Sequence, residues 1–176
     1  MREIRPDKLL IIPDRLPPHK ELAPGSPIAE NRLHLCELCF ADIPGVVVDD
    51  LELQRPGKSY TKDTIRQLTE QYPGWELYLV VGSDMLLSFT EWNSFEYILG
   101  HVTLVCVSRR VGDRPALEVA AEQLRTRYGA KVRILDTEPL MISSSEIRKR
   151  LQSGEAEDLL VPAVAEAIKK NSFYGR

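Results

Sequence analysis

Several features that mark other protein classes are scarce in these 176 residues. The chain has three cysteines, Cys36, Cys39 and Cys106, and an odd count without a secretion signal is typical of reduced thiols. No apolar run approaches the roughly 20 residues that span a bilayer, and the opening MREIRPDKLL lacks the apolar core of a signal peptide. We therefore expect no membrane segment and a cytoplasmic location.

An excess of charge of either sign is also lacking. The chain has 23 Lys and Arg residues against 26 Asp and Glu residues, for a formal net charge of −3. A protein that binds along a nucleic acid needs a basic face to neutralise the phosphates. The balance argues against nucleic acid as a partner, although it leaves room for a small, local anion site.

Familiar catalytic and phosphate-binding signatures are missing as well. The sequence contains neither Gly-x-Gly-x-x-Gly nor the complete Gly-x-x-x-x-Gly-Lys-Ser/Thr of a P-loop. The histidines, His19, His34 and His101, suggest no Ser–His–Asp or Cys–His arrangement, so nucleophilic catalysis is unconvincing. Cys36 and Cys39 have the spacing of half a zinc site, but no second pair completes it. We interpret both thiols as small core residues and assign no metal ligand.

Short runs rich in Val, Ile and Leu are present, and they alternate with amphipathic segments. Most are continuous rather than alternating, which is typical of strands covered on both faces of a parallel sheet. The runs occupy residues 8–13, 45–53, 76–82, 102–107 and 131–136. Helical periodicity between them is clearest over 116–128. This alternation predicts an α/β fold with a doubly wound parallel sheet over 1–141, followed by a small C-terminal helical subdomain over 142–176.

The connection over residues 14–27 is long, holds four prolines and shows no periodicity. Long loops in α/β units are often functional, and this one leaves the carboxyl end of a strand, where ligands bind in open sheets. His19 and Lys20 follow a diproline within it. They are either two cations in water or a preset arm that brings positive charge over an anionic ligand, and sequence alone does not decide.

Two predicted helices begin with hydroxyl residues. In RPGKSYTKDT the helix starts near Ser59, Tyr60 and Thr61, which either cap the helix or accompany an anion site made by its N–H groups. In ISSSEIRKRL, Ser143 and Glu146 predict a capping box.

Basic residues in the first turns of that second helix conflict with the helix dipole, which prefers acids there. Bound phosphates would resolve the conflict. N–H groups, Ser143, Ser144 and Arg148 would then converge on a polyphosphate. The alternative is a capped helix whose Lys149 and Arg150 point to solvent.

The segment VVGSDMLLSFTEWNSFEYIL offers further ligand-binding groups. Gly82 permits close backbone approach, and Asp84 suits the acceptance of ribose hydroxyls. Trp92 either stacks on a flat heteroaromatic ring or packs a helix on the core, and composition favours the core.

Taken in order, IIPDRLPPHK, RPGKSYTKDT, VVGSDMLLSFTEWNSFEYIL and ISSSEIRKRL, with the tail LVPAVAEAIKKNSFYGR, resemble the successive motifs of bacterial nicotinate-nucleotide adenylyltransferases. The similarity runs over about residues 8–174. It implies a Rossmann-like nucleotidyltransferase fold and the synthesis of deamido-NAD and pyrophosphate from ATP and nicotinate mononucleotide. Mg²⁺ is the metal expected to accompany ATP.

The resemblance also implies roles for single residues. The implied substrate-binding residues are His19, Lys20, Ser59, Tyr60, Thr61 and Trp92. The implied ATP-binding residues are Gly82, Asp84, Ser143, Ser144 and Arg148. The helix start at 59–61 would hold the nicotinate carboxylate and Trp92 would stack on the pyridine ring. No catalytic residue is assigned, because in-line attack by the mononucleotide phosphate needs positioning and charge stabilisation rather than a protein nucleophile.

One motif of that family, Gly-x-Phe-x-Pro-x-His-x-Gly-His, does not occur in the sequence. Its histidines contact the ATP phosphates in the family, and loss of one such group lowers a rate by roughly 10²–10³. The opening residues resemble the family's second strand, so we expect the first strand to be missing and this chain alone to have little activity. Alternatives are a non-catalytic mononucleotide-binding fragment, a phosphopantetheine adenylyltransferase of the same fold, and a homo-oligomer that covers an open sheet edge.

Overall fold

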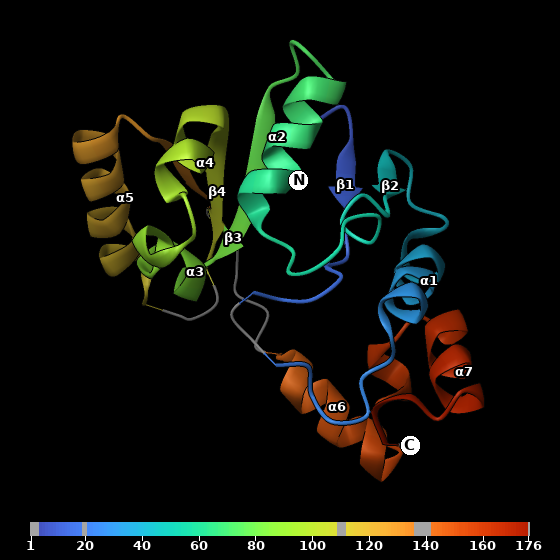
Figure 1. Ribbon diagram of the computed structural model, residues 1–176. Helices are drawn as coiled ribbons and strands as arrows, with labels where there is room; N and C mark the ends of the chain where they lie inside the picture. Colours follow the sequence, from blue (N-terminus) through green and yellow to red (C-terminus); the bar gives the residue numbers. More distant parts are fainter. Residues whose placement is uncertain (1–3, 19–20, 109–111, 136–141, 176) are drawn as a thin grey trace. The chain divides into compact units, whose positions relative to one another are not determined.

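The computed structural model describes residues 4–18, 21–108, 112–135 and 142–175, and Figure 1 shows their course. The chain forms two compact units. The first unit comprises Met1–Ser59 and Ile142–Arg176, and the second comprises Tyr60–Met141. Parallel strands alternate with helices along the chain, which confirms the predicted α/β class. The division into a sheet domain over 1–141 and a helical subdomain over 142–176 stays a prediction.

The first unit contains a two-stranded parallel sheet of β1 (Leu9–Ile11) and β2 (Val46–Val48), with Leu9 opposite Val46. Helix α1 (Ala29–Phe40) connects the strands. The C-terminal elements of this unit are α6 (Ser144–Ser153), η2 (Glu157–Leu159), α7 (Pro162–Lys170) and η3 (Phe173–Gly175).

The core of the first unit lies between α1 and these C-terminal helices. It is made by Leu35, Leu151, Ala156, Val164 and Ile168. The chain's last helices are therefore held by the same apolar cluster as its first one, because burial of these side chains is favourable only when both parts are present.

The second unit contains a three-stranded parallel sheet in the order β3 (Leu77–Gly82), β4 (Val102–Val107), β5 (Lys131–Leu135). Leu77 lies opposite Val102, and Thr103 opposite Lys131. Its helices are α2 (Thr61–Gln71), α3 (Ser83–Leu87), η1 (Phe89–Glu91), α4 (Phe95–His101) and α5 (Arg114–Tyr128).

A larger core fills the second unit. Leu104 of the central strand and Leu117 of α5 are fully buried, and Ile65 of α2 belongs to the same cluster. Helices α2, α3 and α5 thus bury one face each against a single core, and for α5 this agrees with the periodicity predicted over 116–128. None of the helices in the described ranges is both long and apolar enough to cross a membrane.

The strand expected over 45–53 is wrong in length, since β2 ends at Val48. The Asp49 carboxylate accepts a hydrogen bond from the Leu51 N–H at 2.9 Å, and the Leu53 N–H donates to the Asp50 carbonyl at 2.7 Å. Local bonds of this kind compete with a strand ladder and turn the chain. Leu51 and Leu53 nevertheless remain buried, so their apolar pattern reflects a packed turn.

Candidate functional site

Helix α2 begins without a side-chain cap. Tyr60 precedes it in an extended conformation, with φ −86° and ψ 127°, and gives the first turn no side-chain hydrogen bond. The first N–H groups of a helix have no partner within the helix, and they carry the positive end of its dipole. Tyr60 and Thr61, two of the predicted substrate-binding residues, therefore lie at a start that suits an anion.

Ser59, the residue before this start, has a different role from capping. Its hydroxyl is buried and accepts a hydrogen bond from the Arg15 N–H at 2.8 Å, while the Ser59 N–H donates to the Leu16 carbonyl at 2.9 Å. Through these two hydrogen bonds, Ser59 holds the beginning of the proline-rich connection (residues 14–27) against the chain just before α2.

Arg32 of α1 fastens the same connection from a second side. Its guanidinium donates to the carbonyls of Asp14, Arg15 and Pro27 and lies 3.4 Å from the Asp14 carboxylate. Both ends of the connection are thus tied to one helix. His19 and Lys20, predicted to close over the substrate, lie outside the described residues.

Two serine hydroxyls at the carboxyl ends of β3 and β4 donate hydrogen bonds to the same carboxylate, that of Asp113. Ser83 is buried and donates to the Asp113 carboxylate, to which Ser108 also donates at 2.6 Å. No motif in the sequence predicted this cluster. A signal was present, because the carboxyl ends of neighbouring parallel strands meet at one edge of a sheet, and each of these two ends carries a serine.

The predicted ribose-facing residues flank Ser83. Gly82 has φ −81° and ψ 170°, an extended conformation open to any residue, so its backbone does not require glycine. Asp84 is exposed in the first turn of α3. The pKa of the Cys106 thiol is raised to about 11. Burial is the main cause, and the negative charges of Asp113 and Asp84 add to it.

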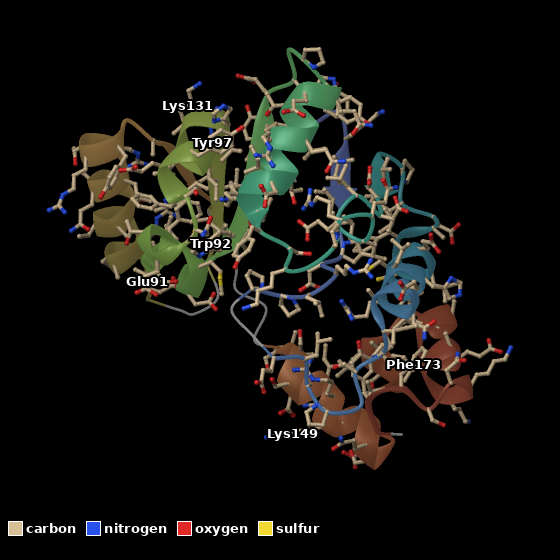
Figure 2. The ribbon with its side chains drawn as sticks, in the orientation of Figure 1. Glu91, Trp92, Tyr97, Lys131, Lys149 and Phe173 are labelled. Carbon is tan, nitrogen blue, oxygen red and sulfur yellow. The ribbon has the colours of Figure 1, made fainter. Side chains whose placement is uncertain are left out.

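Trp92 packs partly on the core, and its stacking on a ligand ring stays a prediction. Its ring stacks on the buried Phe89 with centroids 4.9 Å apart and planes 25° apart, so one part of the indole packs on the core. The side chain stays half-buried, which leaves the remainder open to solvent. Figure 2 shows Trp92 just before α4, the helix that carries Tyr97.

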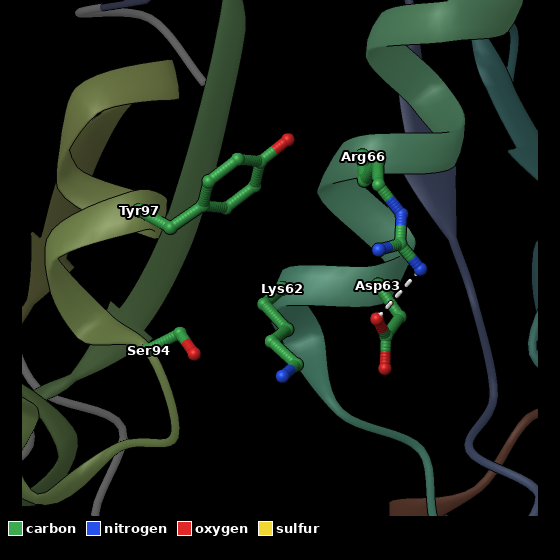
Figure 3. A pocket seen from close by; sticks show the side chains of 5 residues that line it. All are labelled: Lys62, Asp63, Arg66, Ser94 and Tyr97. Carbon is green, nitrogen blue, oxygen red and sulfur yellow. Dashed lines mark hydrogen bonds and ion pairs between the residues drawn. The ribbon is translucent and has the colours of Figure 1, made fainter.

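A pocket of about 220 Å³ lies within the second unit, between the first turns of α2 and α4. Its lining residues are Lys62, Asp63, Arg66, Ser94 and Tyr97 (Figure 3). The volume is smaller than the roughly 300–1,000 Å³ of most ligand pockets, so it suits one small group rather than a whole nucleotide. Lys62, Arg66 and Tyr97 were not among the predicted site residues, although Lys62 and Arg66 have the i, i+4 spacing that places cations on one helix face.

The start of α6 is capped by half of the predicted box. Ser143 accepts a hydrogen bond from the Glu146 N–H at 3.2 Å, while the Glu146 carboxylate accepts one from Arg150 at 3.1 Å. Arg148 donates to the Ser145 hydroxyl at 3.2 Å, so it is turned toward the first turn of the helix.

Most side chains around the first two turns of α6 are exposed. Ser143 and Ser144 are exposed, as are Lys149 and Arg150, and Figure 2 shows Lys149 on the outside of α6. Exposed hydroxyls lie here beside Arg148, which is directed toward the first turn of the helix. This arrangement suits an anion at the helix start.

The C-terminal residues contact both the proline-rich connection and α6. The Tyr174 N–H donates to the Gly25 carbonyl at 2.8 Å, and Gln152 of α6 donates to the Tyr174 carbonyl at 3.3 Å. Gly25 has φ +73°, and a Cβ there would lie 3.0 Å from the Gly175 nitrogen, so the contact requires glycine. Burial raises the pKa of the Tyr174 hydroxyl, and the nearby Arg32 and Arg148 lower it in part.

The predicted site residues fall into both units. Those of the first unit are Ser59, Ser143, Ser144 and Arg148, and those of the second are Tyr60, Thr61, Gly82, Asp84 and Trp92. No group of three or more His, Cys, Asp and Glu side chains that could hold a metal ion occurs in the part of the chain that the structure describes. The described residues therefore do not fit a resident metal.

Sequence comparison decides the family. A family model described as cytidylyltransferase-like matches residues 1–150. The chain belongs to the cytidylyltransferase-like family. The match covers the whole second unit and both strands of the first, so it extends over every parallel strand of the fold.

Curated relatives are similar to nearly the whole chain. A probable nicotinate-nucleotide adenylyltransferase of Symbiobacterium thermophilum is 34% identical over 171 residues, which are 97% of this chain and 82% of the relative. Another from Geobacter sulfurreducens is 37% identical over 183 residues, with 96% and 84% covered. These relatives confirm the resemblance seen in the motifs and the expectation of a nucleotidyltransferase enzyme.

A solved structure shares the fold. The Plasmodium falciparum nicotinic acid mononucleotide adenylyltransferase complexed with NaAD matches with a TM-score of 0.75 at 18% identity, covering 96% of this chain and 82% of that chain. The likeness confirms a Rossmann-like arrangement for this sequence.

Proposed function

We propose that this protein transfers the adenylyl group of ATP to nicotinate mononucleotide, forming deamido-NAD and pyrophosphate in NAD biosynthesis. The observation that carries the proposal is the pocket in the second unit, which is lined both by the first turn of α2 and by Ser94, two residues after Trp92. This lining supports the proposal, because a helix start that suits an anion and a half-exposed indole ring both belong to the second unit. Those are the two groups that a carboxylated pyridine ring needs.

The substrate side of the site would use the start of α2 and Trp92. N–H groups at Tyr60 and Thr61 would hold the nicotinate carboxylate, and Trp92 would stack on the pyridine ring. Ser59, whose hydroxyl is engaged by Arg15, would contribute by fixing the chain before α2. His19 and Lys20 would add positive charge over the mononucleotide.

The remaining predicted site residues would bind ATP. Gly82 and Asp84 would face the adenylate ribose, with Ser83 and Asp113 holding that turn in place. Ser143, Ser144 and Arg148 at the start of α6 would bind the phosphates, where N–H groups and a guanidinium are good partners for oxyanions. Mg²⁺ would arrive with ATP as part of the substrate, since such ions are held largely by phosphates and water.

The chemistry needs no protein nucleophile. A phosphate oxygen of the mononucleotide attacks the α-phosphorus of ATP, a new P–O bond forms, and the bond to the β-phosphate bridging oxygen breaks. Pyrophosphate leaves with that electron pair. The protein contributes by aligning the two substrates and by countering charge that spreads over the phosphates.

Two further expectations belong to this proposal. The absence of the Gly-x-Phe-x-Pro-x-His-x-Gly-His motif from the sequence predicts slow turnover by this chain, so binding is the more direct test. We also infer a cytoplasmic location, as the sequence predicts.

Isothermal titration of this chain with nicotinate mononucleotide and with phosphopantetheine tests the proposal. We expect saturable binding of the mononucleotide that Trp92→Ala abolishes, and no binding of phosphopantetheine. Incubation with ATP, Mg²⁺ and the mononucleotide, followed by mass spectrometry, then shows whether deamido-NAD forms. Product supports the enzyme. Mononucleotide binding without product favours a non-catalytic binding fragment, and phosphopantetheine binding in place of the mononucleotide would overturn the assignment.

A further inference from the structure

We propose that Lys62 makes the pyridine site selective for a carboxylate over an amide. The inference rests on the proposed function and adds a specificity determinant to it. Lys62 is the second residue of α2, in the same turn whose N–H groups would hold the ligand carboxylate, and its side chain lines the pocket between α2 and α4 (Figure 3).

The charges of this pocket leave one cation without an acid. Arg66 and Asp63 form an ion pair at 3.0 Å and largely neutralise each other. Among the residues that the structure describes, no acid pairs with the Lys62 ammonium. The lining therefore carries a net charge of +1 from two cations and one anion, and that charge resides on Lys62.

The other side of the pocket supplies a hydroxyl and an aromatic ring. Ser94 lies in the left-handed region with φ 55°, which is uncommon for a residue other than glycine, and Figure 3 shows its hydroxyl directed toward Lys62. Tyr97 stacks on His101 with ring centroids 4.1 Å apart, which restrains the tyrosine ring at the pocket wall. A small planar group that carries negative charge fits this lining.

Backbone donors at a helix start discriminate only in part between the two ligand groups. An N–H donor bonds either a carboxylate oxygen or an amide oxygen, because both are acceptors. A full positive charge separates them, since it attracts the carboxylate and gains little from a neutral amide. The half-buried position of Lys62 screens its charge less than a fully exposed position would.

The test compares nicotinate mononucleotide with nicotinamide mononucleotide by isothermal titration. The variants are Lys62→Met, which keeps the length of the side chain without its charge, and Lys62→Arg, which keeps the charge. Lys131→Met at the start of β5 is the matched control, because Lys131 is an exposed lysine of the same unit outside the pocket. Thermal unfolding checks that every variant is folded.

We expect Lys62→Met to weaken binding of the acid by about ten-fold and to change binding of the amide by less than about two-fold. Lys62→Arg should restore most of the preference, and Lys131→Met should leave it unchanged. The preference of the unchanged chain should also decrease as salt concentration rises.

The outcomes separate this inference from the proposed function. If the unchanged chain binds the acid and Lys62→Met binds it equally well, or loses both compounds equally, the role of Lys62 is overturned while the function stands. If the unchanged chain binds neither compound, the proposed function is overturned and this inference with it.

Discussion

Serine hydroxyls hold chain segments together at two places in this protein. Ser59 accepts from the Arg15 N–H, and Ser83 with Ser108 donates to Asp113. Buried polar groups need such partners, and a fully satisfied cluster fixes the chain more firmly than packing alone. These bonds restrain the junction of β3 and α3, which carries the proposed ATP-binding residues Gly82 and Asp84.

Cys106 of β4 lies opposite Val81 of β3 and is fully buried. Burial, together with the nearby carboxylates of Asp113 and Asp84, raises the pKa of its thiol from the ordinary 9.0 to about 11. The thiolate is the reactive form, so this cysteine is inert at neutral pH. Burial also raises the pKa of Cys36, although its side chain is only half-buried.

Alkylation with iodoacetamide at pH 8, read by peptide mass spectrometry, checks this. We expect Cys106 to react last in the folded protein and all three cysteines to react at similar rates in urea. Stability should fall as pH rises from about 9 toward about 11, because the unfolded state releases the thiol proton first. In Cys106→Ala that decrease should be smaller. Labelling of native Cys106 as fast as Cys39 would contradict the prediction.

At the scale of elements, the strands and the long helix α5 were predictable because their residues repeat with a clear apolar period. The strand over 102–107 agrees to the residue, whereas that over 45–53 was too long because Asp49 and Asp50 turn the chain through local hydrogen bonds. Local bonding of this kind leaves no periodic signal.

The candidate site was only partly predictable. The hydroxyl-rich helix starts and Trp92 can be recognised in the sequence, since their residue types are unusual at those positions. The pocket depends on how α2 packs against α4, and the roles of Lys62 and Tyr97 follow from that packing. The Asp113 cluster likewise joins residues 30 positions apart.

Arg32 offers a test of how an element holds the proline-rich connection. Its planar fork donates to the carbonyls of Asp14, Arg15 and Pro27, a pattern that lysine cannot reproduce. We expect Arg32→Lys to lower the free energy of unfolding by about 2 kcal/mol, as judged from charge-assisted hydrogen bonds, and to speed tryptic cleavage after Arg15. Urea unfolding and timed proteolysis measure both effects.

Arg66→Lys is the control for that experiment, because the Arg66 guanidinium is largely exposed and makes a surface ion pair with Asp63. Its expected effect on stability is below about 0.5 kcal/mol. Equal effects of the two substitutions would show that the connection does not depend on Arg32.

At the scale of the whole molecule, the parallel strands divide into two sheets rather than one. Within the described residues, β1 is paired with β2 alone and β3 with β4 alone, so each sheet ends in an unpaired edge. Val80 of β3 is 55% exposed although its neighbour Val81 is buried. An edge strand with an exposed apolar side chain is a template for pairing with another chain.

We therefore predict that the protein self-associates as its concentration rises, through the edge of β3. Val80→Lys should shift the population toward monomer, because a lysine on an edge strand opposes pairing with a second copy. Val119→Lys is the matched control: Val119 is 61% exposed, but it lies on helix α5 and not on a strand. Light scattering coupled to size-exclusion chromatography over a concentration series measures the mass of each variant. A monomer at every concentration, or equal effects of the two lysines, would show that the β3 edge does not recruit a second chain.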